Sequence, residues 1–326
     1  MEKRKFGKTG RIVSEIGLGT WQLGTKWGEP FNAKEARAIL EAAYEKGIDF
    51  IDTADVYNNG ESEKAIGEFM ADKKGKLYIT TKCGRALDPH TAEMYTPENM
   101  ERFIDGSLRR LGMERLDMIL LHCPPSPVYE NDELFAAMDG FVKKGKLAAY
   151  GVSIEKVAEG MAAMNYNISA IEVIYNMFRL KPAEELFPAA KEKGIGIICR
   201  VPLASGLLTG RYTKDTVFAK GDHRTYNRNG EAFDKGETFS GVNYEKGLLA
   251  VEALKELFGT SDLIPYALKW ILMNDAVSVV IPGASKASQL DGSIKAAEAP
   301  ELTQEQMDGV KRIYDEFLRE DVHKLW

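Results

Sequence analysis

The stretch NAKEARAILEAAYEKGIDFID, residues 32–52, contains one complete unit of a helix followed by a strand. Asn32 and Glu35 match the capping-box pattern that begins a helix, and Gly47 is the residue type that commonly ends one. Between them, apolar residues recur at helical spacing, at Ala36, Ile39, Leu40, Ala43 and Tyr44. Residues 49–52 then read as a short strand. This order is typical of an α/β fold.

The same unit recurs along the chain. Most of the candidate strands are continuous apolar runs, as expected of parallel strands buried on both faces; they are residues 15–17, 49–52, 77–82, 116–122, 148–153, 170–174, 196–200 and 277–281. A second clear helix begins at Thr96-Pro97 and ends at Gly112. Strands that alternate with helices in this number predict a closed (β/α)8 TIM barrel. Since no long polar linker divides the chain, we expect one domain over residues 1–326.

Two segments do not fit the plain repeat. Residues 5–7 and 11–13 resemble the two arms of an N-terminal β-hairpin, which we expect to plug the lower end of the barrel. Residues 203–244 form a long loop after strand seven, rich in Gly, Lys, Arg and Asn. A loop of this length at the carboxyl end of a barrel strand is expected to close over a ligand.

Composition excludes several classes of function. The formal net charge of −6 is spread along the chain, and there is no basic stripe that could bind nucleic acid. No apolar run approaches the length of about 18 residues that a membrane-spanning helix needs. The first residues lack the apolar stretch of a signal peptide, so a cytoplasmic protein is expected. Cys83, Cys123 and Cys199 lack the spacing of a metal site, and none is expected.

Four ionisable residues stand at or just beyond the carboxyl ends of candidate strands, where barrel enzymes carry their reactive groups; they are Asp52, Tyr57, Lys82 and His122. A tyrosine is a weak acid near neutral pH, and a nearby ammonium group lowers its pKa. We expect Asp52 and Lys82 to form a buried pair that directs Lys82 toward Tyr57. With His122, the group could protonate a carbonyl oxygen as negative charge develops on it.

Plainer interpretations exist for each of these residues. The aspartate could be a helix cap, the lysine could extend its charge to the surface, and the histidine could be a satisfied core residue. Residues 17–24 begin like a Rossmann dinucleotide-binding fingerprint. Gln22 stands where the third glycine belongs, and no helix pattern opens there. The Rossmann alternative is therefore rejected.

The sequence resembles the aldo-keto reductases over essentially its whole length. The resemblance rests on eight motifs in order, which are Gly17-Leu18-Gly19-Thr20-Trp21, Ile51-Asp52-Thr53-Ala54-Asp55-Val56-Tyr57, Ser62-Glu63, Thr81-Lys82, Leu121-His122, Tyr150-Gly151-Val152-Ser153, Pro202-Leu203-Ala204-Ser205-Gly206 and Val280-Ile281-Pro282-Gly283. It implies a catalytic tetrad of Asp52, Tyr57, Lys82 and His122. It also implies hydride transfer from NADPH, or sometimes NADH, to an aldehyde or ketone, with alcohol oxidation as the reverse reaction.

The resemblance also implies a set of cofactor contacts, which are Thr20, Trp21, Asp52, Ser153, Glu172, Arg200, Pro202, Leu203, Ala204, Gly206, Leu208, Arg211, Gly283, Ser285, Lys286, Gln289 and Ser293. Arg211 and Lys286 are the cations from which a preference for NADP(H) is expected. At four positions the chain departs from the family pattern, with Ile154 and Ser293 in place of asparagine, Glu172 in place of glutamine and Arg200 where an aromatic ring is common. We expect Glu172 and Arg200 to form an ion pair beside the nicotinamide.

Substrate contacts are expected from Trp21, Tyr57 and His122. Further candidates on the mouth loops, which could equally be core residues, are Trp27, Arg85, Tyr95, Met177 and Phe178. Such a pocket suits a small carbonyl compound. The main alternative function is a regulatory or scaffold subunit that binds NADP(H), as in the potassium-channel β subunits that share this barrel. Slow single turnover without steady-state cycling would favour that alternative.

Overall fold

Eight parallel strands form the centre of the protein. The computed structural model describes residues 1–25, 29–71, 73 and 75–326. The strands are β3 (Leu18–Gly19), β4 (Phe50–Asp52), β5 (Tyr78–Cys83), β6 (Met118–His122), β7 (Tyr150–Ser153), β8 (Ala170–Ile174), β9 (Gly196–Arg200) and β10 (Val277–Val280). They are hydrogen-bonded in sequence order. Parallel bridges join Ile16 to Val280 and Gly19 to Gly283, so the sheet closes into the predicted (β/α)8 barrel.

The first barrel strand differs from its prediction. We expected residues 15–17, whereas the regular strand is Leu18–Gly19. Residues 15–17 instead form the closing seam, in which the Gly17 amide donates to the Val280 carbonyl at 2.8 Å. The seam needs glycine at Gly19, because a Cβ atom there would lie 2.9 Å from the Ile281 carbonyl oxygen.

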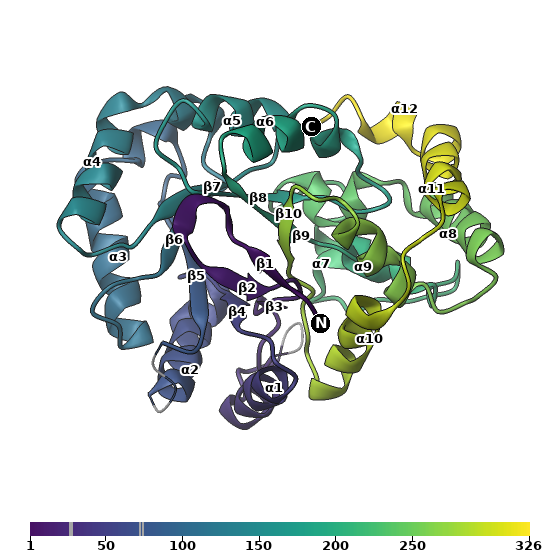
Figure 1. Ribbon diagram of the computed structural model, residues 1–326, viewed down its shortest axis with the longest axis horizontal. Helices are drawn as coiled ribbons and strands as arrows, with labels where there is room; N and C mark the ends of the chain where they lie inside the picture. Colours follow the sequence, from purple (N-terminus) through teal and green to yellow (C-terminus); the bar gives the residue numbers. More distant parts are fainter. Residues whose placement is uncertain (26–28, 72, 74) are drawn as a thin grey trace.

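Helices surround the barrel (Figure 1). They are α1 (Ala33–Glu45), α2 (Glu61–Met70), α3 (Pro97–Leu111), α4 (Asp132–Lys143), α5 (Val157–Ala163), α6 (Leu186–Glu192), α7 (His223–Tyr226), α8 (Tyr244–Phe258), α9 (Ile264–Leu272), α10 (Leu290–Glu298), α11 (Gln304–Phe317) and α12 (Arg319–Val322). The two predicted helix starts are confirmed, because the side chains of Asn32 and Thr96 cap α1 and α3. Gly112 ends α3 in the left-handed conformation.

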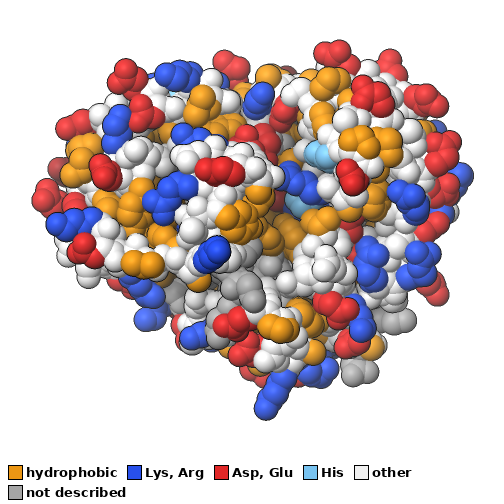
Figure 2. Space-filling model, turned by 180° about the vertical axis from the view of Figure 1, so that it is seen from behind, with side chains coloured by type: hydrophobic (Ala, Val, Ile, Leu, Met, Phe, Trp, Pro, Cys, Tyr) orange, Lys and Arg blue, Asp and Glu red, His pale blue; other side chains and the backbone are white. Residues whose placement is uncertain are grey.

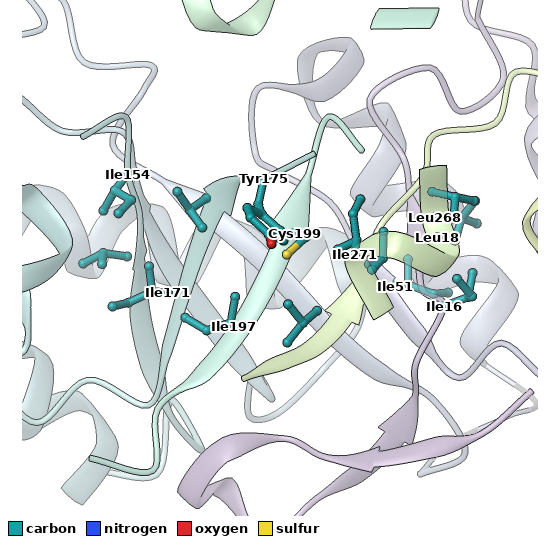
Figure 3. Close-up of a cluster of buried hydrophobic side chains, with 14 of the residues drawn as sticks. Ile16, Leu18, Ile51, Ile154, Ile171, Tyr175, Ile197, Cys199, Leu268 and Ile271 are labelled. Atoms are coloured by element: carbon teal, nitrogen blue, oxygen red, sulfur yellow. The ribbon is translucent and has the colours of Figure 1, made fainter. Parts of the chain in front are cut away.

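Apolar side chains form two clusters. The larger cluster lies between the strands and the helices. Figure 3 shows part of it, with Leu18 and Ile51 on the strands and Leu268 and Ile271 on α9. The smaller cluster belongs to the barrel and the N-terminal hairpin.

The hairpin consists of β1 (Lys3–Lys5) and β2 (Ile12–Ser14), within two residues of the predicted arms. Just after β1, Phe6 is fully buried, and its ring lies 5.3 Å from that of Phe50 and 5.4 Å from that of Tyr78. The hairpin therefore covers one end of the barrel, and the three rings form an aromatic floor there. The carboxyl ends of the strands lie at the opposite end. Within the described residues, none of the helices has the length and apolar character needed to cross a bilayer.

Candidate active site

The four predicted catalytic residues lie together at the carboxyl ends of β4, β5 and β6. The Lys82 ammonium is 2.6 Å from each carboxylate oxygen of Asp52 and 3.4 Å from the Tyr57 hydroxyl. The Tyr57 and His122 rings meet edge to face, with centroids 6.0 Å apart. Lys82 is only 1% exposed, so the predicted buried pair with Asp52 is present.

A tight turn after β4 holds Tyr57 at this place. Asn58 and Asn59 both have left-handed backbone angles, with φ of 50° and 54°, and Gly60 follows at φ 89° before α2 begins. Asparagine and glycine are the residues that tolerate this conformation best. The Asn58 side chain also donates to the Leu23 carbonyl at 3.2 Å, which ties the turn to the loop after β3.

The electrostatics of the site keep a proton on Tyr57. Burial raises the pKa of Tyr57, and the opposing effect of Lys82 is smaller, so the expected lowering by the ammonium is not the net result. Burial disfavours the Lys82 ammonium, but Asp52 and Glu172 outweigh it and the pKa of Lys82 is raised. Burial, followed by the charge of Lys82, lowers the pKa of His122 well below its usual range. At neutral pH the site therefore holds a protonated tyrosine, an ammonium and a neutral imidazole.

A cavity of about 640 Å³ opens in front of these residues. Its size lies within the roughly 300–1,000 Å³ typical of ligand pockets. Many of the predicted cofactor and substrate contacts line it, namely Thr20, Trp21, Asp52, Tyr57, His122, Glu172, Arg200, Pro202, Leu203, Gly206, Gly283 and Gln289. Figure 2 shows the face opposite the hairpin, where histidine and Lys or Arg side chains gather beside a central hollow.

Other predicted contacts lie outside the lining. Ser153 is fully buried behind Glu172, to which its hydroxyl donates at 3.4 Å. The side chains of Ala204 and Leu208 are fully buried in the core. Arg211 is exposed beyond the end of the 3-10 helix Ala204–Thr209, and Ser293 is buried on α10.

The predicted adenine end forms a short turn after β10. The Gln289 side-chain oxygen accepts hydrogen bonds from the backbone amides of Ser285 and Lys286, at 2.7 and 3.1 Å, so it caps the turn. The Lys286 side chain is exposed. Gln289 lines the cavity, and the turn that it caps carries the exposed cation Lys286.

The predicted ion pair between Glu172 and Arg200 is present but is not the main contact of either residue. Their closest charged atoms are 3.8 Å apart. Arg200 lies nearer to Glu237, at 2.6 Å, and to Glu155, at 3.2 Å. Glu172 is nearer to Lys82, at 3.3 Å. Sequence reasoning missed Glu237 because it reaches Arg200 from the long loop, 37 residues away.

Arg200 also contacts every member of a group whose spacing could hold a metal ion. The Cys123 thiol and the carboxylates of Glu155 and Glu237 lie within 4.8 Å of one another. The Arg200 guanidinium contacts all three, including the Cys123 sulfur at 3.6 Å. A cation of the protein itself already balances these ligands.

Several residues of the segment 203–244 line the cavity, among them Leu203, His223 and Glu237. Trp21 packs against two of its rings, with centroid distances of 5.0 Å to His223 and 6.0 Å to Phe233. Trp326 holds the loop through a hydrogen bond that its indole N–H donates to Asp234 at 3.0 Å. The Arg179 guanidinium lies over that indole, 4.0 Å from the ring centroid. No sequence motif pointed to Trp326.

The additional substrate candidates divide into one residue that lines the cavity and three that belong to the core. Arg85 lines the cavity. Tyr95, Met177 and Phe178 are buried in the large apolar cluster and are core residues, which was the plainer interpretation. Trp27 lies outside the described residues.

Comparisons with known proteins agree on one family. The sequence profile described as "Aldo/keto reductase family" matches residues 15–315. The aldo-keto reductase YhdN from Bacillus subtilis is 30% identical, covering 89% of this chain and 87% of its own. A probable voltage-gated potassium channel subunit beta from Oryza sativa subsp. japonica is 29% identical, covering 96% of each chain. The holo form of the aldo-keto reductase AKR11C1 from Bacillus halodurans superimposes with a TM-score of 0.78 at 27% identity, covering 96% of each chain.

Proposed function

The chain belongs to the aldo/keto reductase family, and from this premise we propose that it transfers hydride from NADPH to an aldehyde or ketone, with Tyr57 as the general acid. Family membership makes the chain an oxidoreductase that uses a nicotinamide nucleotide. One observation carries the finer assignment: the Lys82 ammonium contacts both Asp52 and the Tyr57 hydroxyl at the base of a cavity.

The proton transfer follows from the charges around Tyr57. When bound, the nicotinamide nucleotide supplies the hydride, and negative charge develops on the carbonyl oxygen of the substrate. The raised pKa of Tyr57 keeps its proton available until that charge appears. As the proton leaves, the Lys82 ammonium at 3.4 Å stabilises the phenolate, and Asp52 holds the ammonium in place. The neutral imidazole of His122 assists the same oxygen.

The cofactor is proposed to lie along the cavity from the tetrad to the turn after β10. Ser153 and Glu172 would hold the nicotinamide end, and residues 202–208 with Arg211 the pyrophosphate. Lys286 would bind the 2′-phosphate, which makes NADP(H) the preferred form. Charge-assisted hydrogen bonds of this kind contribute about 1.5–3 kcal/mol each.

Replacing Tyr57 by phenylalanine tests the proposal. Tyr57→Phe preserves the ring but removes the donated proton, so carbonyl reduction should fall by about 10²- to 10⁴-fold. Turnover is followed as loss of NADPH absorbance, and binding by NADPH fluorescence titration, which should change little. Tyr44→Phe on α1 is the matched control. A variant that retains more than about a tenth of the wild-type rate, on a substrate limited by chemistry, would disprove the role of Tyr57.

A regulatory role remains the second candidate, supported by the similarity to the probable channel subunit. The two functions differ in kinetics. A reductase cycles with excess NADPH and aldehyde, whereas a binding module would show one slow turnover and then stop. Multiple-turnover measurements with an aldehyde panel separate the two.

A further inference from the structure

Arg85 stands at the mouth of the cavity on a rigid support. It follows Gly84, the residue immediately after β5, which has φ 98° and packs so closely on Tyr95 that a Cβ atom would lie 2.6 Å from that ring. The Leu87 amide donates to the Gly84 carbonyl at 3.2 Å, and Leu87 is itself buried. The half-buried Arg85 side chain therefore projects from a fixed turn into the space that Tyr57 and His122 also line.

The charge of Arg85 is not balanced by a direct partner. It forms no ion pair or hydrogen bond with the residues that the structure describes. Three carboxylates along the cavity contact cations of the protein. Asp52 and Glu172 face Lys82. Glu237 is near enough for Arg85 to help lower its pKa, but its carboxylate is bound to Arg200 at 2.6 Å.

We propose that Arg85 is a carboxylate-binding subsite, and that the substrate is a carbonyl compound carrying a carboxylate group. This rests on the proposed function, because the carbonyl must lie at Tyr57 and His122. A guanidinium presents two parallel N–H groups that match a carboxylate. One unpaired guanidinium balances one carboxylate. A phosphate dianion would leave one of its two charges unbalanced, and Glu237 and Glu172 would repel it more strongly than they repel a singly charged carboxylate.

The test compares each anionic substrate with a neutral partner that has the same carbonyl group and carbon skeleton. 4-Oxobutanoate is paired with its methyl ester, and 4-carboxybenzaldehyde with methyl 4-formylbenzoate, so that a short and a longer spacing are both sampled. Glyceraldehyde 3-phosphate and glyceraldehyde form the phosphate pair. The ratio of kcat/KM, anion over neutral partner, is measured for wild type, Arg85→Gln and Arg85→Lys. Arg102→Gln, on the exposed face of α3, controls for the loss of one positive charge.

We expect at least one carboxylate pair to give a wild-type ratio above about 10. Arg85→Gln should lower that ratio at least about tenfold, mainly through KM, with Arg85→Lys intermediate and Arg102→Gln unchanged. Equal ratios in wild type and Arg85→Gln would overturn the proposal. A preference that depends on Arg85 in the phosphate pair alone would also overturn it.

A binding measurement separates this proposal from the proposed function. Quenching of tryptophan fluorescence reports binding of 4-oxobutanoate and of its ester to the NADP⁺-loaded protein, in which no reduction occurs. The acid should bind at least about tenfold more tightly, and Arg85→Gln should abolish the difference. If this holds while no carbonyl is reduced, the reductase assignment fails and the subsite stands. If carbonyls are reduced but acid and ester bind alike, the subsite is wrong and the reductase assignment stands.

Discussion

Neutralising Glu237 distinguishes the partner of Arg200 seen in the structure from the one expected from the sequence. Glu237→Gln removes the carboxylate that lies 2.6 Å from the guanidinium of the 7%-exposed Arg200. Glu172→Gln removes one that lies 3.8 Å away and is beyond hydrogen-bond distance. The two substitutions have the same chemistry, so their comparison isolates the geometry.

The expected costs follow from what each substitution leaves behind. Loss of one member of a buried pair costs about 3–5 kcal/mol when the other charge is stranded. After Glu237→Gln, Arg200 retains Glu155 at 3.2 Å and the Ile154 carbonyl at 3.0 Å. The cost should therefore be about 1.5–3 kcal/mol, the value of one charged hydrogen bond. Glu172→Gln should cost less than about 1 kcal/mol, because it also relieves the repulsion between two carboxylates that share Lys82.

Two double-mutant cycles with Arg200→Leu measure these couplings through the free energy of unfolding in urea. We expect a coupling of about 1–3 kcal/mol between Arg200 and Glu237, and less than about 0.5 kcal/mol between Arg200 and Glu172. Circular dichroism of each variant before denaturant is added checks that the starting fold is intact. A larger coupling for Glu172 than for Glu237 would refute this account of the network.

Three further predictions concern stability and cofactor choice. Burial, reinforced by the charge of Glu63, raises the pKa of Asp55 to about 7. Between about pH 4 and 7 the folded protein therefore keeps a proton on Asp55 that the unfolded chain has released, and the contribution of Asp55 to the free energy of unfolding falls as pH rises through this range. The free energy of unfolding of Asp55→Asn in urea should therefore exceed that of the wild type by up to about 4 kcal/mol at pH 8 and by less at pH 5. An equal difference at the two pH values would contradict the raised pKa of Asp55. Trp326→Ala should lower the free energy of unfolding by about 3–5 kcal/mol. Trp326→Phe loses mainly the hydrogen bond to Asp234 and should lower it by less than about 1.5 kcal/mol. Similar losses in the two variants would show that packing of the indole is not the main contribution of Trp326 to stability. Lys286→Ala should reduce the preference for NADPH over NADH about 10- to 150-fold in fluorescence titrations, and equal dissociation constants in the wild type would rule out its role.

The sequence was most informative where the fold repeats. Because parallel barrel strands end at one face, residues that follow different strands could be grouped without knowing any contact between them. That reasoning brought Asp52, Tyr57, Lys82 and His122 together, and the structure has them in contact or near contact. Helix boundaries at Asn32 and Thr96 were equally readable, because capping depends on neighbours in sequence.

Sequence was less informative where pairing depends on an irregular loop. The partner of Arg200 could be sought only among residues with predicted positions, and Glu172 on the adjacent strand was the nearest of these. Glu237 lies in a segment with no periodicity, and its position depends on Asp234 and Trp326. The sign of the pKa shift of Tyr57 was missed for a related reason: the nearby ammonium was visible in the sequence, but the depth of burial was not.

The aromatic floor of the barrel has a consequence for proton supply. If Tyr57 gives up a proton in each turnover, that proton must be replaced from bulk water. Phe6, Phe50 and Tyr78 fill the barrel on the hairpin side with rings in contact, and Lys82 is itself buried. Under the proposed mechanism, water would therefore reach the Tyr57 phenolate from the side on which the substrate enters. Reprotonation of Tyr57 would then follow departure of the alcohol, so that proton uptake from solvent would be linked to product release.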